Sequence, residues 1–133
     1  MRPAFIANYL RTLVVDTSTA QGGQLSDQLN HAGFSAGFAV SWHEARAALR
    51  AKHYNSCIVV GDLHQVQDLK QLDELRRLAM SVWIIVLCDV PVEDTKLLLA
   101  RRQGVDAVLS APFSMLDLTS RLAAFSLRTR PTF

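Results

Sequence analysis

The chain lacks the features that mark membrane, secreted or nucleic-acid-binding proteins. Its 133 residues include only two cysteines, four prolines and six glycines, and the formal net charge is +2. The longest apolar run, Val82 to Cys88, is far too short to cross a bilayer, and no apolar segment of signal-peptide length precedes Asn8. Lysine and arginine are scattered and do not form the stripe that nucleic acid would require. We therefore expect a cytoplasmic protein that neither enters a membrane nor binds nucleic acid.

Apolar residues make up 50% of the chain and charged residues 20%, which is enough for one globular domain with a continuous core. We expect this domain to span residues 11–127, after an N-terminal extension (1–10) and before a polar tail (128–133). Cys57 and Cys88 fall inside predicted strands, where they behave as small buried hydrophobes of a reducing compartment. The four histidines lack metal-ligand spacing, so they predict no metal site.

Short apolar segments alternate with helical segments along the chain. The predicted strands cover residues 13–15, 34–40, 57–60, 82–88 and 107–109. Three helices begin at pairs with capping-box spacing, which are Ser18 with Gln21, Ser41 with Glu44, and Ser114 with Asp117. The other two are a leucine stripe over 69–78 and a segment over 91–103. With right-handed crossovers, this alternation predicts a single doubly wound (βα)5 α/β sandwich of the flavodoxin-like type, with a five-stranded parallel sheet in the order 2-1-3-4-5.

The carboxyl ends of the strands are where an open α/β sheet places its ligand or reaction site. The central strand runs into Gly61 and Asp62, and the first strand runs into Asp16 and Thr17. The two carboxylates can be interpreted as a crippled metal site or as solvated groups at strand ends. We favour the second interpretation, because isolated carboxylates specify function weakly.

Four segments carry a resemblance to a known family. They are the first strand with its acidic end (13–16), the start of the second helix (41–45) and the end of the fourth strand (86–88). The fourth segment is residues 103–113, which include Gly104, the fifth strand, Pro112 and Phe113. On these segments, residues 11–127 resemble the receiver domain of bacterial two-component response regulators, the CheY-like family. The resemblance implies a signal-transduction module of a phosphorelay that acts through protein–protein interaction and is not itself an enzyme.

The resemblance also implies a definite chemistry. In the family, an acidic cluster holds Mg²⁺, which prefers carboxylate oxygens. An aspartate attacks a phosphoryl group, and the metal and a lysine neutralise the charge on its oxygens. A threonine or serine hydroxyl then binds the new phosphoryl group and draws its loop inward.

Four of these functional positions are altered in this sequence. Thr17 stands at the second acidic position beside Asp16, and Cys88, a weak hydrogen-bond donor, stands at the hydroxyl position. Ala111 stands at the lysine position, and Val108 stands at the aromatic switch position of the fifth strand. We therefore interpret the chain as a degenerate receiver, or pseudo-receiver, that has no catalytic residue and whose phosphorylation chemistry is lost or impaired.

The phosphoacceptor position depends on how the central strand is aligned. Without a gap, Gly61 falls where the family has its aspartate, and Asp62 comes one residue later. A one-residue slip would restore Asp62, but in a strand it turns the side chain to the other face unless a bulge compensates. The alternative within the family is an ordinary phosphorylatable receiver that uses Asp62 in a phosphorelay, with weak Mg²⁺ binding at Asp16 and Asp62.

A contact surface is implied as well, since receivers signal through the face made by the fourth helix, fifth strand and fifth helix. Because Cys88 and Val108 replace the two moving parts, we expect this face to hold one fixed state, as a homodimer seam or as a docking surface for a protein partner. Its expected members are Arg101, Arg102, Val108, Ala111, Phe113 and Arg121. The resemblance further implies a cis bond between Ala111 and Pro112.

A remote alternative from another class is a flavodoxin-like redox carrier. Residues 17–22 follow the first strand and resemble the hydroxyl-rich loop that holds the FMN phosphate at a helix N-terminus. Ala20 stands where that loop has a glycine, and helix capping explains the same hydroxyl groups. We therefore expect no cofactor.

Overall fold

The computed structural model describes residues 11–17, 21–61, 66–88, 104–110 and 112–128. Several predicted features lie outside these ranges and stay predictions. They are the N-terminal extension, residues 18–20 of the phosphate-like loop, Asp62, the helix over 91–103 with Arg101 and Arg102, Ala111 with its bond to Pro112, and the last five residues.

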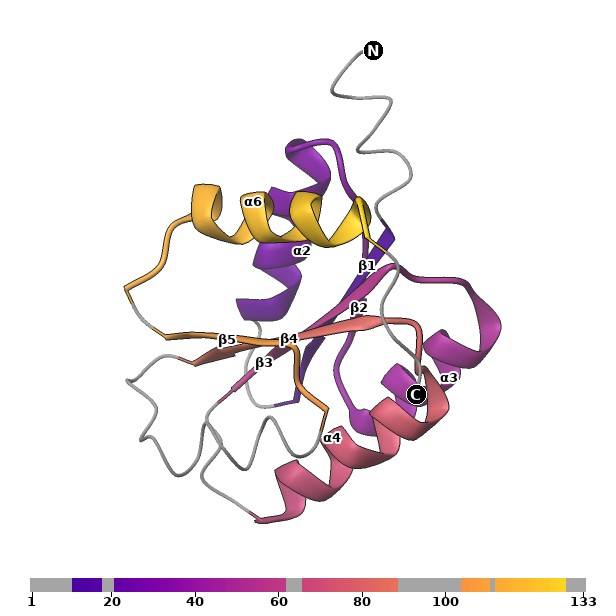
Figure 1. The fold of residues 1–133 in the computed structure, drawn as a ribbon. Helices are drawn as coiled ribbons and strands as arrows, with labels where there is room; N and C mark the ends of the chain where they lie inside the picture. Colours follow the sequence, from indigo (N-terminus) through magenta and orange to yellow (C-terminus); the bar gives the residue numbers. More distant parts are fainter. Residues whose placement is uncertain (1–10, 18–20, 62–65, 89–103, 111, 129–133) are drawn as a thin grey trace.

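The described strands form one parallel sheet in the order β2-β1-β3-β4-β5 (Figure 1). The strands are β1 (Arg11–Asp16), β2 (Ser35–Ala39), β3 (Ser56–Val60), β4 (Trp83–Cys88) and β5 (Ala107–Ser110). The predicted fold class and strand order are confirmed. Each observed strand begins and ends within two residues of its predicted range.

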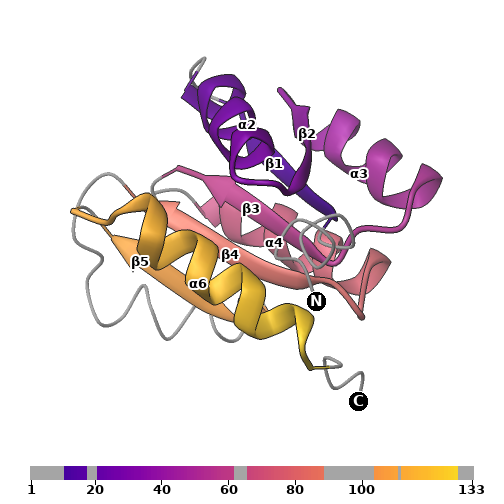
Figure 2. The same cartoon turned by 90° about the horizontal axis from the view of Figure 1, so that it is seen from above.

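Helices cover both faces of this sheet. The described helices are α2 (Gln21–His31), α3 (Trp42–Ala51), α4 (Val66–Leu78) and α6 (Met115–Ser126). Figures 1 and 2 show α2 and α6 on one face and α3 and α4 on the other. At the start of α6, the Ser114 hydroxyl accepts the Asp117 N–H and the Asp117 carboxylate accepts the Ser114 N–H, so the predicted capping box is present.

The core is divided by the sheet into two clusters, and β3 contributes to both. Cys57 and Val59 pack among residues of α3 and α4, whereas Ile58 packs among residues of α2 and α6. Both faces of this strand are buried, as the run of four apolar residues from Cys57 to Val60 predicted. The predicted apolar faces of the neighbouring helices are buried at Leu72, Leu75, Leu118, Leu122 and Phe125.

A buried ion pair that the sequence analysis did not predict ties α4 to the start of β5. Arg76 Nη2 lies 2.8 Å from Asp106 Oδ2, and both side chains are largely buried. The Arg76 guanidinium also donates to the carbonyl oxygens of Gly104 at 3.0 Å and Val82 at 2.6 Å. Asp106 Oδ2 in turn accepts the N–H of Ile84 at 2.9 Å. The pair therefore links α4, β4 and β5 at the amino-terminal edge of the sheet.

Candidate functional site

Strand register brings the predicted site residues of β1, β3 and β4 to one edge of the sheet. Asp16 is the register partner of Val60, and Val60 is the partner of Leu87. The N–H of Gly61 donates to the carbonyl oxygen of Leu87 at 2.9 Å, so Gly61 lies beside the end of β4, where Cys88 follows. This edge is where an open α/β sheet places its site.

Asp16 is buried, and the expectation of a solvated carboxylate was wrong for this residue. Asp16 is only 1% exposed, and its Oδ2 accepts the N–H of Gly22 at 3.0 Å. Gly22 lies in the first turn of α2, where a negative charge is stabilised by the unsatisfied N–H groups and the helix dipole. The carboxylate is therefore already used as a partner of a helix N-terminus.

Glycine at position 22 allows this close approach between helix and strand. A Cβ atom there would lie 2.6 Å from the Asp16 Cβ and 2.5 Å from Phe38 Cε1. Both separations are shorter than van der Waals contact, so a larger residue would push α2 away from the end of β1. The sequence offers Gly22 and Gly23 as a signal of close packing, but it does not indicate which side chains lie against them.

Gly61 stands at the predicted acceptor position in a backbone conformation that favours glycine. Its φ is 153°, and no atom lies within 4 Å of the place where a Cβ would be. There is space for a side chain, but the backbone would be strained in any other residue. Regular β3 therefore ends at Val60, and Asp62 follows this glycine outside the described residues.

Cys88 ends β4 and is fully buried in the cluster beneath α3 and α4. Its thiol thus stands where the resemblance implies a hydroxyl that would face a phosphoryl group. Thr17, at the second acidic position, is exposed. Thr17 therefore lacks the carboxylate that the resemblance implies at its position, and Cys88 lacks the hydroxyl implied at its own.

The two cysteines do not form a redox pair. Cys57 is the register partner of Ile84, so Cys88 lies four residues farther along β4, about 13 Å away along the strand. That separation is too long for a disulfide, and both cysteines are free. Burial raises the pKa of the Cys57 thiol from 9.0 to about 12, against a smaller opposing effect of Arg76, so this thiol stays protonated and inert.

The described members of the predicted contact face lie on different sides of β5. Val108 is half-buried against the cluster of α3 and α4, whereas Phe113 is half-buried against the cluster of α2 and α6. Arg121 is exposed on α6. Of the six predicted members, only the exposed Arg121 projects a long charged side chain from the described part of this face.

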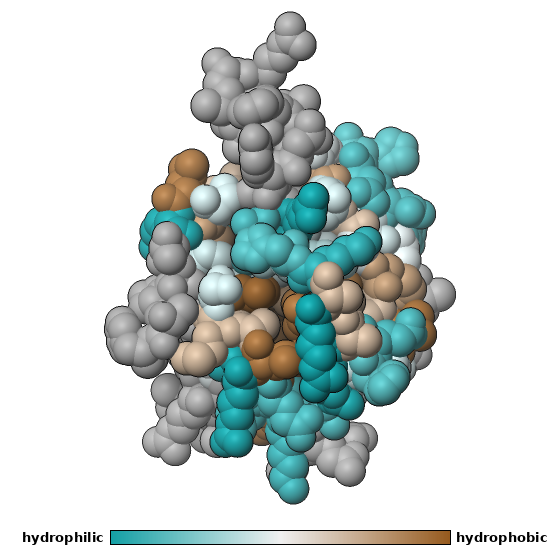
Figure 3. Space-filling view, turned by 90° about the vertical axis from the view of Figure 1, so that its right-hand side faces the viewer, coloured by the Kyte–Doolittle hydropathy of each residue, from teal (hydrophilic) through white to brown (hydrophobic). Residues whose placement is uncertain are grey.

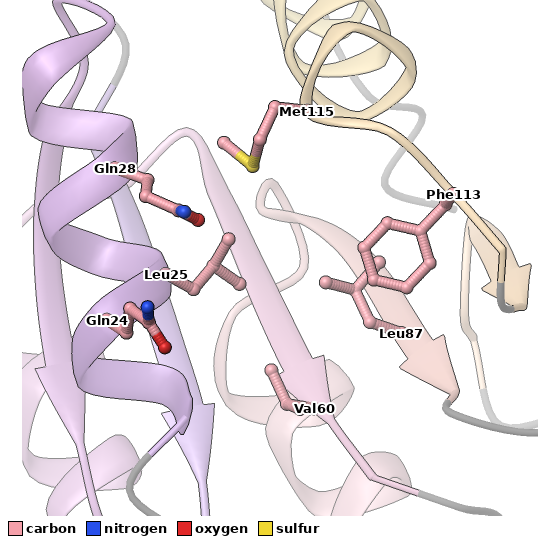
Figure 4. A pocket seen from close by; sticks show the side chains of 7 residues that line it. All are labelled: Gln24, Leu25, Gln28, Val60, Leu87, Phe113 and Met115. Carbon is pink, nitrogen blue, oxygen red and sulfur yellow. The ribbon is translucent and has the colours of Figure 1, made fainter.

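A groove lies beside the carboxyl ends of β3 and β4, and the sequence analysis missed it. It has a volume of about 330 Å³. Figure 4 shows its floor, Val60 and Leu87, between α2 on one side and the start of α6 on the other. The side walls are formed by Gln24, Leu25, Gln28, Phe113 and Met115. Of this lining, the sequence singled out only Phe113, as a member of the contact face, because the groove depends on the spacing between α2 and α6, which no local pattern indicates.

The described residues contain no group of three or more histidine, cysteine, aspartate or glutamate side chains that could hold a metal ion. Asp62 is outside those residues, so its pairing with Asp16 remains a prediction. Among the helices that the structure describes, none is both long enough and apolar enough to cross a membrane.

Comparisons with known proteins identify the fold. No protein family and no curated protein matches the sequence. A response regulator from Thermotoga maritima is similar in structure, with a TM-score of 0.78 and 19% identity over 91% of this chain and 100% of that chain. A two-component response regulator from Clostridium difficile has a TM-score of 0.77 and 19% identity over 90% and 97% of the two chains.

A pilus assembly-related protein from Burkholderia pseudomallei is also similar, with a TM-score of 0.72 and 20% identity over 88% of this chain and 91% of that chain. Identities of this size show a shared fold and nothing finer. The chain therefore has the CheY-like fold of response regulator receiver domains.

Proposed function

We propose that the chain is a receiver-like signalling module of the cytoplasm that acts through protein–protein contact and whose phosphoryl chemistry is lost or severely impaired. The observation that carries this proposal is the buried Asp16 carboxylate, which accepts the Gly22 N–H beside an exposed Thr17 and a buried Cys88. The receiver fold supports a role in signalling, and the altered site supports the loss of chemistry. In this proposal the domain has no enzymatic activity and no cofactor.

The physical argument concerns charge. Mg²⁺ needs several oxygen ligands, and the described part of the site offers one carboxylate that is already hydrogen-bonded to a helix N-terminus. A phosphoryl group would add negative charge to a site where Ala111 replaces the lysine. The test is whether a small phosphodonor with Mg²⁺ adds a phosphoryl group to the chain.

The alternative of a phosphorylatable receiver rests on Asp62. In that case the chain beyond Gly61 would turn the Asp62 carboxylate back toward Asp16. The glycine conformation at position 61 supports an irregular path there, which is what a compensating bulge would require. The same phosphodonor experiment separates this alternative from the proposal, because it would yield a product that Asp62→Asn abolishes.

A second candidate setting is pilus assembly, to which the Burkholderia pseudomallei neighbour is related. The same fold extends over 91% of that chain. In such a setting, a receiver-like domain serves as a fixed docking element and needs no phosphoryl switch. Stable co-purification with components of a pilus assembly apparatus would favour this setting over a two-component pathway.

The fixed contact face leads to a prediction about self-association. If the face made by the predicted helix over 91–103 with β5 and α6 is a homodimer seam, the double substitution Arg102→Glu with Arg121→Glu will weaken dimerisation at least about tenfold, because it reverses two charges at the predicted seam. The matched control is Arg50→Glu. Arg50 is an exposed residue in the last turn of α3, which packs on the face of the sheet opposite to α6.

Sedimentation velocity measures this association. The proposal expects the same dimer with and without a phosphodonor and Mg²⁺, and expects the control variant to behave as the unmodified chain. A chain that is monomeric alone and dimeric only after phosphodonor treatment would instead be an ordinary switching receiver.

A further inference from the structure

The amino-terminal edge of the sheet, opposite the predicted receiver site, carries a stacked arrangement of two aromatic rings and a cation. The rings of Trp83, at the start of β4, and Phe125, near the end of α6, stack with centroids 4.3 Å apart and planes within 6°. The Arg128 guanidinium carbon lies 5.3 Å from the Trp83 ring centroid and 5.6 Å from the Phe125 ring centroid. Both distances are in the cation–π range.

The contact with the rings does not use up the hydrogen-bond donors of the guanidinium. A guanidinium carries five N–H donors in a planar fork, and its electrostatic attraction to an aromatic ring does not require them. Among the described residues, no acceptor receives a hydrogen bond from the Arg128 side chain and no carboxylate pairs with it. The cation is thus held in place by the rings while its fork of donors stays available.

A pocket of about 250 Å³ opens beside this cation, and its polar lining is rich in donors. It is lined by the stack together with His53, Asn55 and Ser81. The Asn55 side-chain oxygen already accepts the Arg11 N–H at 2.9 Å, which leaves the amide NH₂ group as a donor. The lining therefore combines the Arg128 cation with further hydrogen-bond donors, and none of the described residues that form it is a carboxylate.

Three exposed cations lie around this edge. Arg11, Lys52 and Arg128 are exposed there, whereas the carboxylate of Asp106 is neutralised by its pairing with Arg76. Figure 3 views the molecule from this edge, where hydrophilic side chains surround a smaller apolar centre.

We propose that this pocket is a binding site for an oxyanion, a phosphate or carboxylate group, which the Arg128 guanidinium receives with two N–H donors. Arginine matches the two oxygens of such a group better than lysine does, and the existing contact of Arg128 with Trp83 lowers the entropy lost on binding. Asn55, Ser81 and His53 provide further donors around the bound group. The site is separate from the carboxyl-edge residues and does not depend on the proposed loss of phosphoryl chemistry.

The full-length chain is titrated with inorganic phosphate and, separately, with succinate, at constant ionic strength maintained with chloride. Binding is followed by NMR through the indole N–H of Trp83, which is distinguished from that of Trp42 by the variant Trp42→Phe. We expect a saturable shift of the Trp83 signal with a Kd below about 1 mM for at least one of the two anions. Tighter binding of phosphate identifies a phosphate ligand, and tighter binding of succinate identifies a carboxylate ligand.

Arg128→Gln removes the charge while keeping a polar side chain, and it is expected to weaken the binding at least about tenfold. The matched control is Lys70→Gln on α4, which also removes one exposed positive charge and is expected to bind as the unmodified chain does. Because Arg128 is exposed beyond the end of α6, the folded state is expected to persist, and the unchanged remainder of the NMR spectrum verifies it. No saturable shift with either anion, or equal weakening by the two substitutions, would overturn the proposal.

Discussion

Arg76→Met is expected to lower the free energy of unfolding by about 3–5 kcal/mol, the largest effect of any single substitution considered for this chain. The substitution leaves the Asp106 carboxylate buried without its cation at 2.8 Å, and it removes the donors to the carbonyl oxygens of Gly104 and Val82. The loss arises mainly from the uncompensated, largely buried charge and from buried or partly buried carbonyl groups that lose their donor. Urea unfolding followed by circular dichroism measures it.

The adjacent Arg77 supplies a matched control. Arg77 also pairs with an aspartate, Asp73 at 3.0 Å, but its side chain is 79% exposed. Arg77→Met is therefore expected to change the free energy of unfolding by less than about 1 kcal/mol. Equal effects of the two substitutions would show that burial does not set the importance of the Arg76–Asp106 pair.

Asp16→Ala is expected to destabilise the fold by about 1–3 kcal/mol, because it leaves the Gly22 N–H buried without its acceptor and removes a negative charge from the N-terminus of α2. The opposite sign is expected of an acidic metal pocket. There, removal of one of several crowded carboxylates relieves repulsion between like charges and stabilises the protein.

The response to Mg²⁺ provides the control for this prediction. An ion that binds the folded state raises the apparent stability in proportion to the logarithm of its concentration over Kd. We expect the melting temperature of the unmodified chain to be the same in millimolar MgCl₂ and in NaCl of equal ionic strength. Stabilisation by Mg²⁺ that Asp16→Ala abolishes would contradict the assignment of Asp16 to helix capping.

The architecture was predictable because local signals agreed with one another along the chain. The apolar run of β3 indicated a strand buried on both faces, and its neighbours in the sheet bear this out. The Ser114 and Asp117 pair marked the start of α6 correctly. Such signals depend on residues close in sequence, so single-sequence patterns capture them.

The details that decide the site and its surroundings depend on residues far apart in sequence. Asp16 was interpreted as a solvated carboxylate because isolated carboxylates specify function weakly, but the approach of α2 at Gly22 buries it. The Arg76–Asp106 pair joins residues thirty positions apart, and no local pattern indicates that they meet. The stack of Trp83 with Phe125 was equally invisible, because Trp83 had been placed only as a strand residue.

The central claim is that this receiver fold does not carry out phosphoryl transfer, and intact-mass spectrometry tests it most directly. The purified chain is incubated with acetyl phosphate and Mg²⁺, beside an active receiver domain as a positive control and the variant Asp62→Asn. We predict that the positive control gains the mass of one phosphoryl group while this chain and its variant do not. A donor- and Mg²⁺-dependent gain of one phosphoryl group on this chain, absent from Asp62→Asn, would contradict the claim.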